Sequence, residues 1–427
     1  MAPSFPASGE FLRAIRKSSR DLRIASGISI TPEHIKRLLL SPAFVDSFKR
    51  VSAQHGLALP LQFSSHVDEL NLLAVLSLLN FASGYRVPLH IQTGRGAWDS
   101  IRAFVFSLYI SSSEGDYLSA KGLRALKAQK IAELMNISLH IEHPHETIPG
   151  LTIGELGGPL YELVMHIEAI LNETGQILED GGYPNLGVFV VETLEQSRRQ
   201  QSSDADVVEF VLEKLVRAFP GFRDMTEVNG QRELFNTHQD VQTTSQLISA
   251  IYCFKKALFL IHAISIRFGS ISPAPFPIPS TSHIPVFSDN VLPSLLVHLG
   301  VIDLSSTPSC AGLFPDSGAD ENLTSLLGPA PSSVKEASKS KKAPKEGPIV
   351  TPDQSYILRA AAIDACELII ETAQTLDVKS LGKENEHLDW IFKITLPDLD
   401  MWIWAVAKDR PDYRSLERFV DQNTIYF

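Results

Sequence analysis

Asp289 occupies a position at which an acidic side chain can do chemistry. It lies in the segment 287–290 (FSDN), directly after a Pro- and Ser-rich loop and before an apolar stretch that ends at Gly300. Aspartate is a common N-cap residue, so the pattern by itself favours a structural cap. A carboxylate at the start of a helix can also line a cleft, where it stabilises positive charge and accepts a proton from water.

Two adjacent lysines, Lys255 and Lys256, precede the apolar sequence ALFLIHAISI. A lysine at the start of a buried helix can extend its ammonium group to solvent along its aliphatic stem. The same residue can instead place a compact, flexible cation in a pocket, which suits a phosphate group. The residue types alone leave both interpretations open.

The segment 93–97 (TGRGA) is rich in glycine, and Arg86 and His90 precede it. Glycine lets backbone N–H groups approach an anion, but this segment matches neither the P-loop nor the dinucleotide fingerprint. A tight turn is therefore the favoured interpretation, with ligand contact as the alternative.

His143 and His145 flank a proline and have acidic neighbours, which is superficially similar to a metal site. The pattern lacks HExxH spacing and a third ligand, so we expect a solvated surface, no metal and no cofactor. The GxSxG nucleophile motif is also absent from the sequence, and serine-hydrolase chemistry has no support.

Composition excludes several classes of protein. The 427 residues include 44% hydrophobic and 20% charged residues, enough for a large core, and the net charge of −11 argues against polynucleotide binding. Three cysteines without a CxxC pair indicate a reducing compartment. No apolar run reaches the ~20 residues that span a membrane. We therefore expect a cytoplasmic protein without nucleic-acid or membrane partners, although the basic N-terminal stretch leaves a mitochondrial location open. The oligomeric state also stays open.

Helical periodicity dominates the chain. Apolar spacing and capping residues predict a helix that begins after Thr31. They predict further helices over 68–81, two pieces of 119–135, 159–178, 207–219, 251–268, 290–299, 352–376 and 396–408. The best strand candidate is the short segment 187–191, and βαβ alternation is absent from the pattern. We predict an all-α fold with an N-terminal extension (1–30) and a single helical domain (31–427). Its Ser-, Pro-, Gly- and Lys-rich segment 305–347 is expected to be a disordered insertion.

Nine segments, in order, resemble the queuosine-salvage family of queuosine 5′-phosphate N-glycosylases. The resemblance runs from about Asp68 to the C-terminus, and its strength lies in the order of the segments, since no single motif is specific. The matching segments are 79–81 (LNF), 171–175 (LNETG), 218–224 (AFPGFRD), 254–257 (FKKA), 287–289 (FSD) with Pro293, 298–300 (HLG), Arg359 with 367–369 (ELI), Asp400 with Trp404 and Ala407, and 424–427 (TIYF).

The resemblance implies an all-α fold similar to helix-hairpin-helix DNA glycosylases and an N-glycosyl hydrolase activity. The expected reaction releases queuine from queuosine 5′-phosphate for tRNA queuosine salvage. Asp289 takes the position of the catalytic carboxylate, which stabilises an oxocarbenium-like state, and Lys255 takes the position of the phosphate ligand.

Further substrate contacts are expected from residues in the matching segments. Acidic residues can pair with the secondary amine of queuine, and aromatic side chains can stack on the flat base. The candidates for substrate binding are Asn80, Phe81, Arg359, Glu367, Asp400 and Trp404.

The sequence also departs from the family pattern. The Arg and Gln that follow the catalytic Asp are missing from 290–294 (NVLPS), the His-Arg-rich tetrad is replaced by 420–423 (VDQN), and the Phe-x-Trp is replaced by 81–84 (FASG). Arg86, His90 and Arg95 form a basic segment specific to this chain, and 232–249 reads as an insertion. The alternative function is therefore an inactive or substrate-shifted relative that binds a nucleotide or acts as a scaffold.

Overall fold

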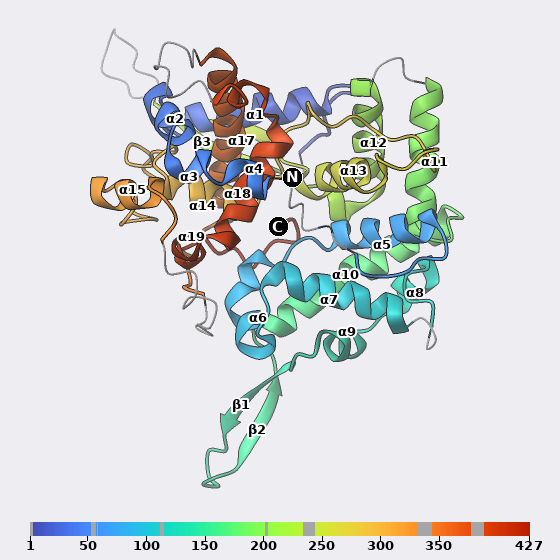
Figure 1. The fold of residues 1–427 in the computed structure, drawn as a ribbon. Helices are drawn as coiled ribbons and strands as arrows, with labels where there is room; N and C mark the ends of the chain where they lie inside the picture. The colour runs from blue at the N-terminus through green and yellow to red at the C-terminus, as the bar shows by residue number, and fades with distance from the viewer. Residues whose placement is uncertain are drawn as a thin grey trace.

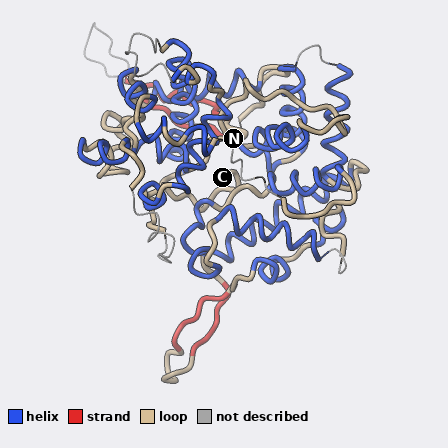
Figure 2. Tube along the Cα trace, in the orientation of Figure 1, coloured by secondary structure: helices blue, strands red, loops and turns tan. Residues whose placement is uncertain are grey.

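The structure is a computed structural model, and it describes residues 3–52, 57, 59–111, 115–200, 204–233, 244–331, 344–376 and 388–427. The chain is mainly α-helical, which confirms the predicted fold class (Figures 1 and 2). Within the described residues, β structure is confined to two antiparallel two-stranded sheets and two isolated bridges. The helices form two groups that meet around the C-terminal residues.

The first group combines helices from the two ends of the sequence. It comprises α1 (Phe11–Ala25), α2 (Pro32–Leu39), α3 (Pro42–Val45), α4 (Phe48–Val51), α14 (Val291–His298), α15 (Asp320–Leu327), α17 (Pro352–Thr375), α18 (Leu396–Asp409) and α19 (Pro411–Ser415). The central helix α17 packs against α1, α2, α14 and α18. A capping box fixes its start, because Thr351 accepts the N–H of Gln354 and donates its own N–H to the Gln354 side chain.

The second group comes from the middle of the sequence. It comprises α5 (His66–Leu78), η1 (Ser83–Tyr85), α6 (Arg86–Thr93), α7 (Ala97–Ile110), α8 (Ala120–Ala125), α9 (Ala128–Met135), α10 (Pro159–Asp180), α11 (Leu186–Gln200), α12 (Asp204–Ala218), η3 (Pro220–Phe222) and α13 (Lys255–Phe268). Helix α5 is apolar on nearly all sides and packs against α7, α11 and α13. A helix without a polar face belongs in the interior, as its sequence predicts.

The two sheets are hairpins. Strand β1 (His140–Pro144) pairs with β2 (Thr152–Leu156), and this hairpin projects from the body of the molecule (Figure 2). Strand β3 (Met225–Glu233) pairs with β4 (Thr244–Tyr252). The expected insertion 232–249 therefore forms parts of β3 and β4, while residues 234–243 lie outside the described residues.

The predicted strand 187–191 is wrong, because these residues belong to helix α11. Local and tertiary contacts together make this segment helical. Asn185 accepts the N–H of Val188 at 2.9 Å, and Asn71 accepts the N–H of Gly187 at 3.0 Å. Val190 and Leu194, four residues apart, are both buried. A helical spacing of buried positions thus outweighs the β propensity of the valines.

The other expected helices are present, with small shifts at their ends. Helix α13 begins at Lys255 and not at Ile251, because residues 251 and 252 complete strand β4. The structure also differs from the expected disorder over residues 305–331. Cys310, Phe314, Leu323 and Leu327 are buried, and α15 forms within this segment. Residues 332–343 lie outside the described residues.

Residues 3–30 pack onto the body through α1. Arg20 and Arg23 pair with the buried Asp364 of α17 at 3.0 and 2.8 Å, and Glu209 of α12 accepts the N–H of Leu12 at 3.1 Å. Helix α1 therefore ties the first helix group to the second.

No single helix among the described residues has the length and apolar character needed to cross a membrane. The bent pair His66–Leu78 and Ser83–Thr93, with an angle of 68°, meets the criterion by length and composition alone. Residues 70–76 within the first of these helices are all buried inside the protein.

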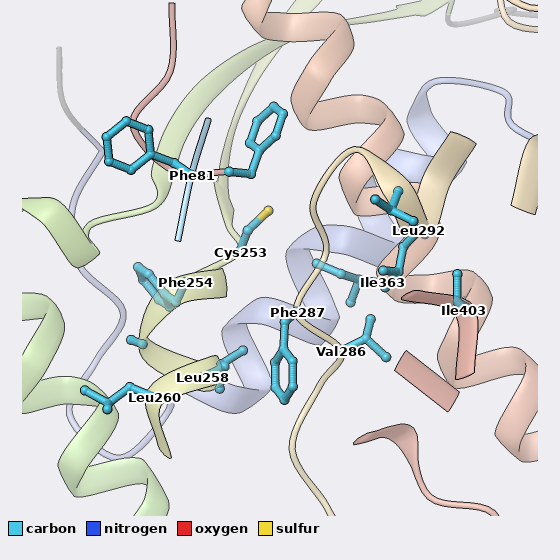
Figure 3. Packing of buried hydrophobic residues seen from close by; sticks show 14 of the residues in the cluster. Phe81, Cys253, Phe254, Leu258, Leu260, Val286, Phe287, Leu292, Ile363 and Ile403 are labelled. Carbon is cyan, nitrogen blue, oxygen red and sulfur yellow. The ribbon is translucent and has the colours of Figure 1, made fainter. Parts of the chain in front are cut away.

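The hydrophobic core continues from one helix group into the other. Figure 3 shows buried side chains of the loop before α14 close to those of α13, α14, α17 and α18: Phe254, Leu258, Val286, Phe287, Leu292, Ile363 and Ile403. Close packing on this scale holds neighbouring backbone segments in fixed positions. The segments that carry the candidate site residues lie within this packed region.

Candidate active site

A small cavity lies where the two helix groups meet. The lining residues are Asn80, Trp98, Lys255, Phe259, Phe287, Asp289, Asp400, Met401 and Trp404. Five of the eight site residues predicted from the sequence are therefore brought together here.

Asp289 lies at the start of α14 and combines the two roles considered for it. Its Oδ1 accepts the N–H of Val291 at 2.6 Å and that of Leu292 at 3.3 Å, so it satisfies backbone donors of the first helical turn. The side chain is only 5% exposed and it also lines the cavity. One carboxylate oxygen is thus held by the helix, which orients the group without removing it from the cavity.

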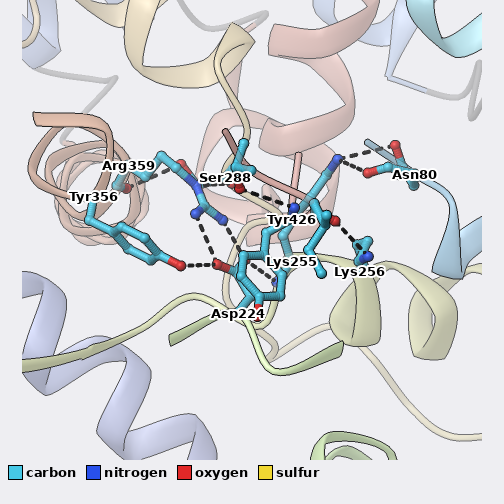
Figure 4. Close-up of polar contacts among 10 residues, drawn as sticks. Asn80, Asp224, Lys255, Lys256, Ser288, Tyr356, Arg359 and Tyr426 are labelled. Atoms are coloured by element: carbon cyan, nitrogen blue, oxygen red, sulfur yellow. Dashed lines mark hydrogen bonds and ion pairs between the residues drawn. The ribbon is translucent and has the colours of Figure 1, made fainter. Parts of the chain in front are cut away.

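Lys255 is the first residue of α13. Its Nζ donates to the backbone oxygen of Asn80 at 2.6 Å and to the Asn80 side-chain oxygen at 3.1 Å (Figure 4). Burial lowers the pKa of Lys255 to about 8, whereas the nearby Asp289 charge acts in the opposite direction. The preceding Phe254 has a φ of 46°, a conformation that costs a non-glycine residue ~1–2 kcal/mol. The backbone directly before Lys255 is therefore held in a conformation that is uncommon for a residue with a side chain.

Asp400 extends from α18 into the same cavity. Its Oδ2 accepts the N–H of Phe287 at 2.7 Å, which fixes the loop two residues before Asp289. Burial raises the pKa of Asp400 to about 7, the Phe287 N–H opposes this shift, and the Asp289 charge adds to it. Two carboxyl groups in one cavity thus have different environments, a pattern typical of sites that divide acid and base roles.

Aromatic side chains form much of the cavity wall. Trp98 lies edge-on to both Trp404 and Phe259, with ring centroids 6.2 and 5.7 Å apart, and Phe259 lies edge-on to Phe287 at 6.1 Å. Aromatic pairs in this arrangement stabilise the fold by more than the burial of their surface alone. The indole Nε1 of Trp98 is buried and has no hydrogen-bond partner in the described part of the chain. The wall therefore offers flat apolar surfaces and one unused donor.

A second lysine lies beside the wall. The Nζ of Lys408 lies 3.2 Å from the ring centroid of Trp404. Burial lowers the pKa of Lys408 to about 7, and the charges of Asp99 and Asp289 oppose that shift. Lys408 thus places a titratable amine close to the aromatic wall.

A buried ion pair supports the site from behind. Arg359 of α17 pairs with Asp224 through both carboxylate oxygens, and both side chains are fully buried (Figure 4). Asp224 accepts the N–H of Lys255 at 3.2 Å, and Arg359 donates to the backbone oxygen of Ser288 at 2.9 Å. The pair is therefore connected to the backbone next to both Asp289 and Lys255.

Three predicted substrate contacts do not line the cavity. Arg359 is occupied by Asp224 and Ser288, which gives it a supporting position. Glu367 pairs with Arg16 of α1 at 2.7 Å. The Phe81 ring lies 5.2 Å from the Nζ of the neighbouring Lys256, whose ammonium group donates to the backbone oxygen of Ile425 at 2.7 Å. These side chains are taken up by protein partners, so their expected contacts with substrate are not supported.

The other candidate motifs also lie away from the cavity. Segment 93–97 joins α6 to α7 through Gly94, whose φ of 70° suits a tight turn, in line with the favoured interpretation. His143 is exposed and His145 is half-buried, and both lie on the β1–β2 hairpin. Within the described ranges, no group of three or more His, Cys, Asp or Glu side chains is arranged to hold a metal ion.

Four lining residues were not predicted: Trp98, Phe259, Phe287 and Met401. Two of them carry a signal that sequence reasoning could have used. Phe259 lies four residues after Lys255 and so shares its face of α13. Phe287 is two residues before Asp289, within the matching segment itself. Trp98 has no such signal, because only tertiary packing brings α7 to this cavity.

No protein-family model matches this chain, and no curated protein matches it. The assignment of a function therefore depends on the site itself and on the order in which the nine matching segments occur in the sequence.

Proposed function

We propose that this protein is an N-glycosyl hydrolase that releases queuine from queuosine 5′-phosphate. The observation that carries the proposal is the cavity that joins Asp289, Lys255 and Asp400, three residues from separate segments of the sequence resemblance. An aromatic wall completes this cavity. A scaffold protein has no need for an open space between a carboxylate, a lysine and a second, protonatable carboxyl group.

Asp289 is the proposed catalytic carboxylate. Cleavage of an N-glycosidic bond passes through an oxocarbenium-like state, with positive charge on the ribose ring. A carboxylate oriented by backbone N–H groups stabilises this charge, and its free oxygen accepts a proton from the attacking water. Burial of the site strengthens the interaction, since few water molecules screen the charge.

Asp400 is the proposed second carboxyl group of the reaction. Because its pKa is raised to about 7, a substantial fraction is protonated at neutral pH. In that form it donates a hydrogen bond or a proton to the departing base. In its ionised form it pairs with the secondary amine of queuine, the role suggested by the resemblance.

Lys255 is the proposed ligand of the substrate phosphate. Asn80 accepts two of its hydrogen bonds, which fixes the ammonium group while leaving its charge available. Trp404 and Trp98 offer flat surfaces on which the base can stack, and the unused Trp98 N–H can donate to it.

A binding function without catalysis is the second candidate. It is favoured by the use of Asp289 Oδ1 as a helix cap and by the absence of the family's Arg and Gln after Asp289. A chain of this kind would still bind a nucleotide at Lys255 without cleaving it.

Queuine release from queuosine 5′-phosphate tests the proposal, with wild type compared with Asp289→Asn. The amide keeps an oxygen for the Val291 and Leu292 N–H groups and removes the charge, so the fold is retained. We expect release by wild type and a loss of at least ~100-fold in the variant, the usual size of such electrostatic contributions.

Binding is measured beside release, by calorimetry with the same substrate. Binding by wild type without release would identify the non-catalytic relative. If the folded protein shows no binding and no release, queuosine 5′-phosphate is excluded as the ligand, and the proposed function is excluded with it.

A further inference from the structure

A second, smaller hollow lies on the other side of the loop that carries Asp289. Four separate segments line it, including residues 83–87, Asn290, 345–347 and Arg418. Asn290 belongs to this hollow, whereas its neighbour Asp289 belongs to the larger cavity. The two spaces therefore share one loop but have different walls.

The walls of this hollow are assembled by close backbone contacts. A Cβ atom on Gly84 would lie 2.4 Å from the backbone oxygen of Asp421, and one on Gly347 would lie 2.0 Å from that of Arg418. Asn290 donates its side-chain N–H to Phe419 at 2.9 Å. These contacts hold the segments around the hollow in one arrangement, so it is a constructed feature of the fold.

Two arginines from distant parts of the sequence face this hollow. Arg86 donates to the backbone oxygen of Lys345 at 3.3 Å, and Arg418 donates to that of Ala407 at 3.0 Å. Neither guanidinium has a carboxylate within ion-pair distance among the residues that the structure describes. Each therefore keeps most of its five N–H donors free of acceptors from the described residues.

The charges around the hollow are mainly positive. Burial lowers the pKa of Arg86, and burial together with the Arg86 charge lowers the pKa of Arg418 to about 9. Asp289 partly opposes the shift of Arg418, Glu417 pairs with Lys345, and Glu346 is exposed at the rim. Two partly buried like charges without a carboxylate at ion-pair distance are unfavourable, and a bound anion lowers that cost.

We propose that this hollow is a binding site for a phosphate group, held between the guanidinium groups of Arg86 and Arg418. The planar guanidinium fork matches the oxygen atoms of phosphate in paired hydrogen bonds. The site is separate from the proposed phosphate contact at Lys255 and does not depend on the proposed hydrolase activity.

Calorimetric titration with inorganic phosphate tests the proposal, at pH 7 and at an ionic strength held constant with sodium chloride. We expect saturable binding by wild type and a weakening of at least ~10-fold in Arg86→Gln and in Arg418→Gln. Arg95→Gln is the matched control, because Arg95 is an exposed arginine nine residues after Arg86. Its affinity for phosphate should equal that of wild type.

Far-UV circular dichroism first establishes that each variant is folded. Arg86→Gln is the decisive variant if Arg418→Gln is not folded, because Arg418 also holds the end of α18. Ribose 5-phosphate, titrated in the same way, distinguishes the possible sources of the group. Binding that depends on Arg86 identifies a phosphate ester as a ligand, whereas binding of inorganic phosphate alone identifies a site for the free ion.

Two results overturn the proposal. One is the absence of saturable phosphate binding by wild type. The other is binding that is lost in Lys255→Met but unchanged in Arg86→Gln, which would place the phosphate in the Asp289 cavity.

Discussion

Asp224 and Arg359 form a fully buried ion pair whose other hydrogen bonds hold the backbone beside both Lys255 and Asp289. Tyr356 donates to the same Asp224 carboxylate at 3.1 Å, so its oxygens have several donors. Burial alone disfavours the charge of Arg359, but Asp224 outweighs it and raises the pKa of the guanidinium group. Both members therefore remain charged in the interior.

Removal of one member of this pair is expected to destabilise the fold strongly. Arg359→Met leaves the Asp224 carboxylate buried without its counter-charge, which costs ~3–5 kcal/mol. Urea unfolding measures the loss. The double variant Asp224→Leu/Arg359→Met is the control, because it leaves no isolated charge and should recover part of the stability. A loss below ~1 kcal/mol in the single variant would show that the pair does not hold the two segments.

Asp289 has a structural role that is separable from its charge. Asp289→Ala removes the acceptor for Val291 and Leu292 and should lower the free energy of unfolding by ~1 kcal/mol. Asp289→Asn keeps that acceptor and should lose less. Thermal unfolding compares the two variants, and equal stability in both would contradict the capping role.

The adjacent lysines form a matched pair for testing substrate binding. Lys255→Met removes the ammonium group from the cavity, so KM for queuosine 5′-phosphate should rise at least ~10-fold. Lys256→Met removes an amine that donates to Ile425 and lies beside Phe81 and Tyr426 outside the cavity, so KM should stay within about twofold. Steady-state kinetics measures both variants. A similar rise of KM in both would mean that Lys255 has no specific role.

Asp400 makes the stability of the protein depend on pH. Its pKa in the folded chain, about 7, lies above the value of 3.8 for an unperturbed aspartate, so the folded state binds the proton more tightly. This contribution is complete below about pH 4 and is lost as the pH rises through 7, by up to ~4 kcal/mol. Asp400→Asn removes the titration. The stability difference between wild type and this variant, measured by urea unfolding from about pH 5 to pH 8, should therefore shift against wild type as the pH rises. A constant difference would contradict the raised pKa.

Glu367 provides a test of the correction to the predicted site. It pairs with Arg16 and does not line the cavity, so Glu367→Gln should leave kcat/KM for queuine release within about twofold of wild type. The half-buried pair should contribute only ~1 kcal/mol to stability. A large fall in kcat/KM would return Glu367 to the substrate site.

The sequence by itself determined most of the helices and the position of the candidate carboxylate. Helix starts such as Thr31 and Thr351 are fixed by hydrogen bonds that span three residues, and apolar spacing fixes the buried faces. Such contacts are local, so they can be predicted without a fold. The segment 187–191 shows the limit of local rules, because the contact between Gly187 and Asn71 joins residues 116 positions apart.

Only the tertiary structure decided which polar residues face a common space. A hydrogen bond joins Asp400 to Phe287, which are 113 positions apart in the sequence, and another joins Lys255 to Asn80, which are 175 positions apart. Glu367, by contrast, is paired with Arg16 across 351 positions. Residue type indicates what a side chain can do, but its partner depends on how distant helices pack. Packing of the two helix groups therefore decides that Asp289, Lys255 and Asp400 share a cavity.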